Sequence, residues 1–324
     1  MTDRVAALLP GPRRALFLRA CLLDGEDARA AWAAWLAGAD DPAAAFADRR
    51  HACVRLAPLL VGVANGPGSG RLGAAATASL VREELRWRTL ASAAAEALET
   101  LRGAGLEPVL VGGAAAALTA YATPWQRHCH DVDLVVDGTA RVAAARLLAA
   151  AGWHPDPGAP SLAHPSGSRV SLHASPLRAP GRTLAGLRDR GGTVELGGER
   201  VTVAAPEHLL LRACEGAFVR AGGSLAWAAD AAVLARSLDE EGWARAVEDA
   251  RRAGAAAPAA VALGFLAREV GLPLPAGPLA GLAAQVDGRA EADCLALVPR
   301  LAAPRRVARR VRRELTRVVG RRRA

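Results

Sequence analysis

The sequence predicts an α+β fold that is mostly helical, with a small mixed β-sheet between two helical segments. Residues 1–104 carry apolar side chains at helical spacing, and the same pattern returns after Pro206. Between them, from Glu107 on, short apolar runs alternate with helical stretches, which is typical of an α/β unit. We therefore divide the chain into a helical N-terminal region, an α/β core, a C-terminal helical domain and a basic amphipathic tail. Their boundaries are 1–104, 105–204, 205–303 and 304–324.

The N-terminal region is predicted to be a helical support without chemistry of its own. Its longest predicted helix runs from Leu72 to Arg102, where almost no breaker interrupts the apolar spacing, and Gly103 and Gly105 suit its C-cap. The shorter elements expected before it are helices near 16–23 and 28–36, a helix opening at Asp41-Pro42, and a turn at 67–70.

The central segment is expected to form strands and helices in alternation. The predicted strands are Pro108–Val111, Val132–Val136 and Arg169–His173, followed by a hairpin over Thr193–Val203 that turns at Gly197-Gly198. The helices between them are predicted at Gly113–Ala122 and Arg141–Ala151. Beyond the sheet, helices are expected at 206–221, 225–237, 240–253, 257–270, 278–301 and 305–320.

The composition limits what can be argued from abundance. The 324 residues allow two or three domains with ample core, and 52% of them are hydrophobic, mostly Ala, Leu and Val. No lysine occurs, so all 41 basic residues are arginine. Coding bias explains an Ala/Arg-rich, Lys-free composition more simply than function does. Alanine content therefore carries no functional weight here.

The net charge of +9 comes from one segment of the chain. Residues 304–324 contain ten arginines against Glu314 alone, which leaves residues 1–303 neutral. A basic tail on a neutral body differs from a basic binding face. In the tail, valine and leucine residues share one helical face, a pattern that suits docking on the body, an anionic membrane surface or a nucleic acid.

Cysteine usage and apolar patterning indicate a soluble protein of the cytoplasm. The five cysteines are dispersed without a CxxC pair, which argues against a disulfide framework and a zinc knuckle. The N-terminal stretch MTDRVAALLPGPRR lacks the long apolar core of a secretory signal. No apolar run reaches the roughly 20 residues that a membrane span needs.

The stretch from Val109 to Val136 carries the chemistry. Gly112-Gly113 lies between a strand and a helix, where backbone N–H groups can approach an anion at the helix N-terminus. Asp131 and Asp133 lie one residue apart in the next strand, so their side chains point to the same face. Carboxylate oxygens suit Mg²⁺, which is held by a few carboxylates together with substrate phosphates. This combination is the half-site that nucleotidyl transfer requires.

The order of these motifs resembles the nucleotidyltransferase superfamily of polymerase-β-like fold. The segment RHCHDVD, residues 127–133, is similar to the R-x-x-x-D-h-D signature of its stand-alone bacterial members. The resemblance covers about residues 85–275. It is supported by VSLHA around His173, by PEHLL at 206–210 and by LAWAADAAVL at 225–234.

The resemblance implies a role for each matching residue. Asp131 and Asp133 match the metal-binding, catalytic carboxylates, and two Mg²⁺ ions are implied for an active enzyme. Gly112 and Gly113 match the turn that holds the triphosphate of the nucleotide, and Arg127 matches an arginine that neutralises phosphate charge. The helical Asp230 matches an aspartate that positions the site or contacts substrate.

The chain departs from the superfamily at the third carboxylate. The matching position is Ser171, whose hydroxyl supplies neither the charge nor the basicity of a carboxylate. Glu195 or His173 substitutes for it, or catalysis is weak or absent. Simpler readings stand beside these roles: Arg127 is a solvated charge, His173 a hydrogen-bonded core histidine, and Asp230 the partner of a neighbouring arginine. The consecutive residues His128, Cys129 and His130 cannot easily converge on one metal ion.

The leading hypothesis is a Mg²⁺-dependent transfer of a nucleoside monophosphate from a nucleoside triphosphate to the hydroxyl of an unidentified acceptor. ATP, GTP, CTP and UTP remain open as donors. One alternative is a degenerate member of the superfamily that binds a nucleotide or a protein partner without turnover. The other is a nucleic-acid-associated protein that works through its arginine-rich tail.

Overall fold

The computed structural model describes residues 3–38, 52–64, 70–156, 161–177, 186–219, 224–286 and 288–298. Their architecture is α+β and mostly helical, as the sequence predicts, with one mixed seven-stranded sheet. The predicted helix at Asp41-Pro42, most of the turn at 67–70 and the whole tail 304–324 lie outside the described residues. None of the described helices is both long and apolar enough to cross a membrane.

The sheet has the strand order β3-β4-β5-β2-β1-β7-β6. Its central strands β1 and β2 are antiparallel, whereas β1 pairs in parallel with β7 and β2 in parallel with β5. The predicted strands are confirmed; the two short strands β3 and β4 at one edge were not predicted. The strands are β1 (Val109–Val111), β2 (Asp131–Val135), β3 (His154–Pro155), β4 (Leu162–Ala163), β5 (Arg169–His173), β6 (Gly192–Leu196) and β7 (Glu199–Val203).

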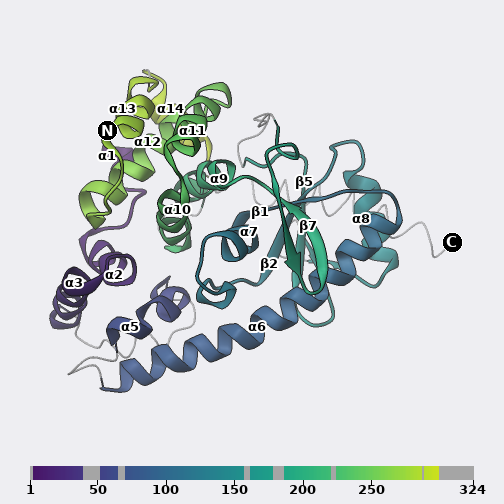
Figure 1. The fold of residues 1–324 in the computed structure, drawn as a ribbon, viewed down its shortest axis with the longest axis horizontal. Helices are drawn as coiled ribbons and strands as arrows, with labels where there is room; N and C mark the ends of the chain where they lie inside the picture. The colour runs from purple at the N-terminus through teal and green to yellow at the C-terminus, as the bar shows by residue number, and fades with distance from the viewer. Residues whose placement is uncertain are drawn as a thin grey trace.

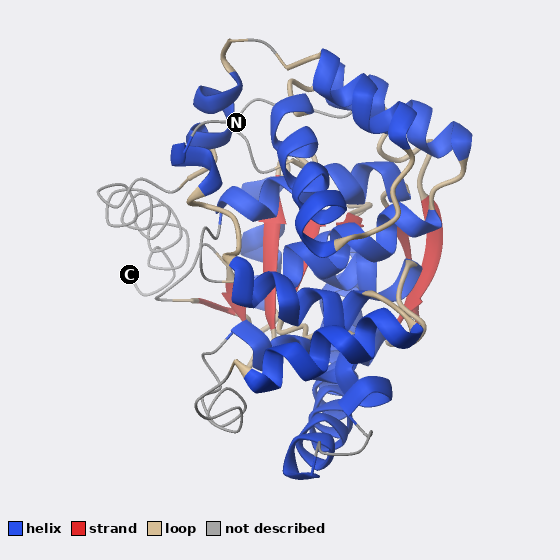
Figure 2. Ribbon diagram, turned by 90° about the vertical axis from the view of Figure 1, so that its left-hand side faces the viewer, coloured by secondary structure: helices blue, strands red, loops and turns tan. Residues whose placement is uncertain are grey.

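Helices enclose the sheet and extend away from it (Figure 1). Turned by 90°, the strands lie among helices above and below them (Figure 2). Before the sheet come α1 (Asp3–Ala6), α2 (Pro12–Leu22), α3 (Gly25–Ala37), the 3₁₀ helix η1 (Ala52–Leu60), α5 (Val61–Ala64) and α6 (Gly70–Gly103). Within it come α7 (Gly112–Thr119), the 3₁₀ turn η2 (Pro124–Gln126) and α8 (Arg141–Ala150).

The C-terminal helices follow β7 and differ from the prediction at one place. The predicted helix at 278–301 is wrong: α13 ends at Ala284 and a new helix starts at Ala290, after the helix breaker Gly288. The helices are α9 (Pro206–Val219), α10 (Ala226–Ser237), α11 (Glu240–Arg252), α12 (Ala256–Phe265), the π turn η3 (Leu266–Val270), α13 (Ala276–Ala284) and α14 (Ala290–Ala296).

The long helix α6 joins the N-terminal helices to the sheet. It runs along the lower side of the molecule from α5 to the strands (Figure 1) and packs against η1, η2 and α8. Leu90, Leu98 and Leu101 are buried along it, whereas Leu85, which shares their helical pattern, is 59% exposed. One hydrophobic core runs through the N-terminal helices, the sheet and the C-terminal helices.

The short helix α7 shows why its alanines matter. All four residues from Ala114 to Ala117 are buried, and α7 packs against β2 on one side and α9 on another. Side chains this small let the helix lie close to both. The alanines of α7 therefore have a structural use, although coding bias explains the high alanine content of the whole chain: they bring the glycine turn at the start of α7 next to α9.

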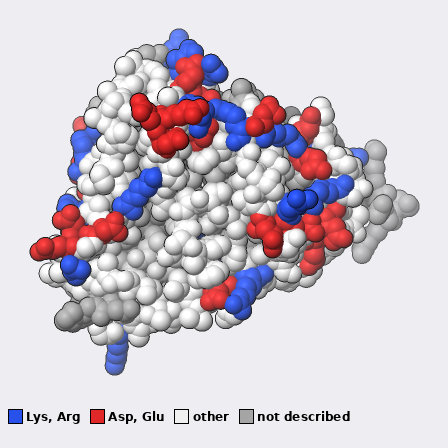
Figure 3. Space-filling view, viewed as in Figure 1, with Lys and Arg blue, Asp and Glu red and all other residues white. Residues whose placement is uncertain are grey.

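Charged side chains are mixed in sign on the face shown in Figure 3. Arginines and carboxylates lie together in groups near its rim, and its centre is uncharged. This face therefore carries no continuous basic surface, in agreement with a body whose charges cancel. The basic tail that the sequence analysis singled out lies outside the described residues.

Candidate active site

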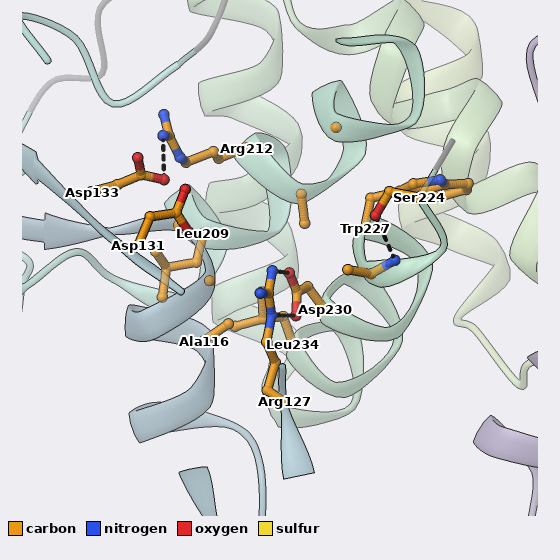
Figure 4. A pocket seen from close by; sticks show the side chains of 15 residues that line it. Ala116, Arg127, Asp131, Asp133, Leu209, Arg212, Ser224, Trp227, Asp230 and Leu234 are labelled. Carbon is orange, nitrogen blue, oxygen red and sulfur yellow. Dashed lines mark hydrogen bonds and ion pairs between the residues drawn. The ribbon is translucent and has the colours of Figure 1, made fainter. Parts of the chain in front are cut away.

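The paired carboxylates stand on the central strand β2. Val132 and Leu134 face the core, while Asp131 and Asp133 are partly exposed on the other face, because side chains alternate along a strand. The Asp131 side chain is 27% exposed and the Asp133 side chain 13%. Both side chains line one pocket (Figure 4), so the predicted pair is on one face and reachable.

The glycine turn lies directly against this strand. Strands β1 and β2 pair so that Val111 stands opposite Asp133, and the chain then enters α7 at Gly112. Gly112 has φ +73°, a left-handed conformation that favours glycine. A Cβ atom there would lie 2.3 Å from Oδ2 of Asp133. Gly112 is therefore required both by its backbone conformation and by the approach of the carboxylate.

Gly113 makes room for an arginine in the same way. A Cβ atom on Gly113 would lie 2.5 Å from Cζ of Arg127. The sequence predicts that this glycine lets a phosphate approach; in the structure its lack of a side chain also lets the Arg127 guanidinium lie against the start of α7.

Arg127 forms a bidentate ion pair with Asp230. Its Nε and Nη2 donate to the two carboxylate oxygens of Asp230 at 3.1 and 2.8 Å, and Nη1 donates to the backbone carbonyl of His128. The hydroxyl of Tyr121 donates to the same carboxylate at 2.9 Å. Burial alone would lower the pKa of Arg127, but the Asp230 charge outweighs it and raises that pKa. Burial, followed by the Asp230 charge, raises the pKa of Tyr121.

Arg212 is a site residue that the sequence analysis missed. It stands on α9, and its Nη2 donates to Oδ2 of Asp133 at 2.8 Å while Nη1 donates to the carbonyl of Pro176 at 2.6 Å. Its side chain is only 2% exposed. The signal in the sequence was weak: Arg212 is a lone charged residue among the apolar residues LLL and AC, one turn after the PEH start of the helix.

The three remaining candidates fall in different places. His173 on β5 lies beside Asp133, and its Nε2 is 2.8 Å from Oδ1 of that carboxylate. Ser171 stands opposite Asp133 in the parallel pairing of β5 with β2, so the predicted position of the missing carboxylate is next to the site. Glu195 is exposed on the edge strand β6, with β1 and β7 between that strand and β2. Its position argues against Glu195 substituting for a third carboxylate.

The pocket is closed on its second side by the C-terminal helices. Leu209, Arg212, Ala213 and Gly216 line it at helical spacing along α9, and α10 adds Trp227 and Asp230 (Figure 4). Including its open mouth, the pocket encloses about 620 Å³ of empty space. The β-sheet therefore supplies the paired carboxylates, and α9 and α10 supply a wall that is partly apolar.

A second group of potential metal ligands lies outside this pocket. Glu207, His208 and Asp249 are buried, and one ligand atom from each lies within 4.8 Å of the others. Arginines already neutralise both carboxylates: Arg190 is 2.6 Å from Asp249, and Arg245 is 3.1 Å from Glu207. A cation would have to displace these side chains, so the group is a buried ion-pair cluster.

The residues between η2 and β2 do not form a metal cluster of their own. Nδ1 of His128 lies 3.0 Å from a carboxylate oxygen of Glu83 on α6. Burial raises the pKa of the Cys129 thiol to about 12, which keeps it protonated at neutral pH. The hydrogen bond between His128 and Glu83 therefore holds the segment that carries Arg127 against α6.

Comparison with known proteins assigns the family. A family model described as an uncharacterised nucleotidyltransferase matches residues 70–270, from the start of α6 to the end of η3. No curated protein and no solved structure matches the chain. The match spans more than half of the chain and includes the paired carboxylates, the glycine turn and both pocket arginines. The chain therefore belongs to this nucleotidyltransferase family.

Proposed function

We propose that the protein transfers a nucleoside monophosphate from a nucleoside triphosphate to a hydroxyl group of an acceptor. The observation that carries the proposal is the convergence on one pocket of Asp131, Asp133, the Gly112-Gly113 turn, the partly buried Arg127 and the buried Arg212. Paired carboxylates, free backbone N–H groups at a helix start and fixed cations are the groups that phosphoryl chemistry uses.

The two aspartates fit a divalent metal ion. Their carboxylates supply oxygen ligands, both line the pocket, and Asp131 keeps about a quarter of its side chain exposed. Mg²⁺ prefers such a site, with phosphate and water oxygens completing its six ligands. When bound, the ion would polarise phosphate oxygens and offset the charge that develops on them.

The remaining residues bind and orient the nucleotide. The first N–H groups of α7 point away from the helix body and can donate to phosphate oxygens, while Gly112 and Gly113 add no side chain that would block the approach. Arg212 is fixed by Asp133 and Pro176, and Arg127 by Asp230, so neither guanidinium needs ordering when the nucleotide binds.

The reaction exchanges one bond to phosphorus for another. The acceptor oxygen attacks the α-phosphorus, the bond from that phosphorus to the β-phosphate oxygen breaks, and pyrophosphate leaves. The proton of the hydroxyl is released to water at the open mouth of the pocket. Little covalent chemistry is asked of the protein, because positioning and charge neutralisation supply most of the catalysis.

Binding of labelled nucleotides tests the proposal. Each of ATP, GTP, CTP and UTP is titrated into the protein with Mg²⁺ and with EDTA. We expect at least one to bind only with Mg²⁺, and the double variant Asp131→Ala, Asp133→Ala to lose that binding. The proposal fails if none of the four binds in a Mg²⁺-dependent way, or if the double variant binds as well as the original chain.

A second candidate function is nucleotide binding without turnover. Ser171, a neutral side chain directly opposite Asp133, is the observation that favours it. A non-catalytic member would bind a nucleotide with Mg²⁺ and release no pyrophosphate over many hours with any hydroxyl-bearing acceptor. Pyrophosphate release that Asp133→Asn abolishes would eliminate this candidate.

A further inference from the structure

A buried glutamate on α6 lies two hydrogen bonds away from the pocket arginine Arg127. Glu83 is 5% exposed, and its two carboxylate oxygens lie 3.1 and 3.0 Å from Nδ1 of His128. Because a carboxylate only accepts hydrogen bonds, Nδ1 carries the proton and is the donor. The backbone carbonyl of His128 in turn accepts from Nη1 of Arg127. A chain of contacts therefore runs from α6 through His128 to the guanidinium in the pocket.

The carboxylate of Glu83 is ionised and its position is fixed. Burial alone would raise its pKa, but hydrogen bonds from His128 and Arg86 outweigh burial, so that pKa lies below its ordinary value of 4.5. Arg86, one turn further along α6, donates to the same carboxylate and balances its charge. A hydrogen bond to an ionised acceptor is stronger than one between neutral groups. The contact between Glu83 and His128 is therefore a firm one.

The guanidinium of Arg127 has a defined place beside the phosphate-binding turn. Asp230 on α10 accepts from Nε and Nη2 at 3.1 and 2.8 Å (Figure 4). A Cβ atom on Gly113 would lie 2.5 Å from Cζ of Arg127, so the guanidinium lies directly against the start of α7. The N–H groups that would bind phosphate are at this helix start. A shift of the guanidinium would therefore separate its positive charge from these N–H groups.

The guanidinium is held from two sides of the molecule. Nε and Nη2 form the edge that faces Asp230, whereas Nη1 lies outside that edge and contacts the carbonyl of His128. The side chain of His128 is held by Glu83 on α6. The family match begins at residue 70, where α6 starts, so this helix is part of the matched domain. The sequence predicts a support without chemistry in this region, and Glu83 gives that support a direct connection to the pocket.

We propose that Glu83 is a positioning residue for nucleotide binding: it holds His128, whose carbonyl keeps the Arg127 guanidinium beside the start of α7. The inference rests on the proposed function, in which Arg127 neutralises charge on the phosphates. Glu83 does not touch the nucleotide and acts through Arg127 alone. The helix α6 thereby fixes one side of this arginine, as α10 fixes the other through Asp230.

Binding of nucleotide analogues to variants of α6 tests the proposal. The α,β-methylene analogues of ATP, GTP, CTP and UTP are each titrated with Mg²⁺ into the folded proteins. Glu83→Ala removes the acceptor, and we expect about tenfold weaker binding of each analogue that binds the original chain, the size of one lost hydrogen bond to a charged group. Glu83→Gln keeps an oxygen that accepts from Nδ1 of His128 and should recover most of this loss. Glu84→Ala is the matched control and should leave binding unchanged, because Glu84 pairs with the exposed Arg88.

A double-mutant cycle tests whether Glu83 acts through Arg127. Arg127→Lys keeps the charge that balances Asp230, but a lysine cannot donate to Asp230 and to the His128 carbonyl in the same planar geometry. In the Arg127→Lys background we expect Glu83→Ala to weaken binding by no more than about twofold, because residues that act as a unit have non-additive effects.

The possible results separate the inference from the proposed function. Unchanged binding in Glu83→Ala, an equal loss in Glu83→Gln, or a full tenfold loss in the Arg127→Lys background would overturn the inference and leave the proposed function standing. Absence of Mg²⁺-dependent binding of all four analogues to the original chain would overturn the proposed function, and the inference with it. His128→Ala breaks the same hydrogen bond and leaves Glu83 paired with Arg86. It should show the same loss as Glu83→Ala and replaces that variant, alone and in the cycle, if circular dichroism shows that Glu83→Ala does not fold.

Discussion

Two ionic clusters meet on helix α9, and they differ in how completely their charges are matched. The first, called the closed cluster, consists of Arg190, Glu207, His208, Arg245 and Asp249. The second, called the pocket cluster, consists of Arg127, Asp131, Asp133, Arg212 and Asp230. In the closed cluster two carboxylates face two arginines, whereas in the pocket cluster three carboxylates face two.

The difference separates a structural role from a binding role. Asp249 and Glu207 are buried, and each has an arginine within 3.1 Å or less. Asp131 has the imidazole of His130 at 3.9 Å and remains 27% exposed. A matched, buried cluster has no remaining charge to offer a ligand, while an excess carboxylate that lines a pocket does. We therefore expect substitutions in the closed cluster to affect stability and those in the pocket cluster to affect binding.

The largest expected effect is on nucleotidyl transfer in the pocket cluster. Asp133→Asn keeps the shape of the side chain but removes the charge that would hold the metal ion, and we expect pyrophosphate release to fall about a thousandfold, as when one electrostatic stabiliser of a transition state is removed. The matched control is Asp249→Asn in the closed cluster, whose rate per folded molecule should stay within about threefold of the original. Equal losses in the two variants would contradict the division of roles.

The free energy of unfolding is expected to fall more for a substitution in the closed cluster than for one in the pocket cluster. Asp249→Asn leaves Arg190 and His208 facing a neutral amide, and breaking a buried pair costs ~3–5 kcal/mol. Because the Arg190 side chain is 29% exposed, we expect a smaller loss of about 2 kcal/mol. Asp131→Asn should change stability by no more than about 0.5 kcal/mol, since its side chain is partly exposed. Urea unfolding measures both; a larger loss for Asp131→Asn would reverse the assignment.

Sequence reasoning reached the parts of the site that lie close together in the chain. The offset of Arg127 from Asp131 and the alternation of Asp131 with Asp133 are local patterns, and each residue is on the predicted element and lines the pocket. The glycine turn was equally local, although one reason for its glycines, the approach of Asp133 and Arg127, depends on neighbours that only the fold supplies.

The contacts between distant segments could not be read from spacing. Asp230 pairs with Arg127 across 103 residues, and Arg212 reaches Asp133 across 79. Only its apolar neighbours distinguish Arg212 from a solvated charge on a helix, and that local signal is weak. The closed cluster was missed for the same reason, because Arg190, Glu207 and Asp249 come from three segments that meet only in the folded chain.

An intermediate effect on both stability and nucleotide binding is expected at the largely buried ion pair between Arg127 and Asp230. Asp230→Asn removes the charge that balances Arg127, and the guanidinium is left facing a neutral amide beside Gly113. We expect a loss of about 2 kcal/mol in the free energy of unfolding together with about tenfold weaker Mg²⁺–nucleotide binding, since an unbalanced buried charge is costly and its position is no longer fixed. Calorimetric titration of the folded variant measures the binding change. Stability lost without any change in affinity would assign Asp230 to the structural class of the closed cluster.

The smallest expected effect is the loss, at acid pH, of the stability that Asp249 contributes in the closed cluster. Burial alone would raise the pKa of Asp249, but hydrogen bonds from His208 and Arg190 outweigh it, so the folded-state pKa lies below its ordinary value of 3.8. A lowered carboxyl pKa contributes stability that is fully present above the ordinary value and is lost as the pH falls through the folded-state pKa. The stability difference between the original chain and Asp249→Asn should therefore be constant from pH 7 to about pH 5 and should shrink below about pH 4. Urea midpoints of both proteins at pH 7, 5, 4 and 3 measure this. A difference that stays constant down to pH 3 would show that the Asp249 charge contributes nothing to the closed cluster, and the contrast with the pocket would then rest on packing alone.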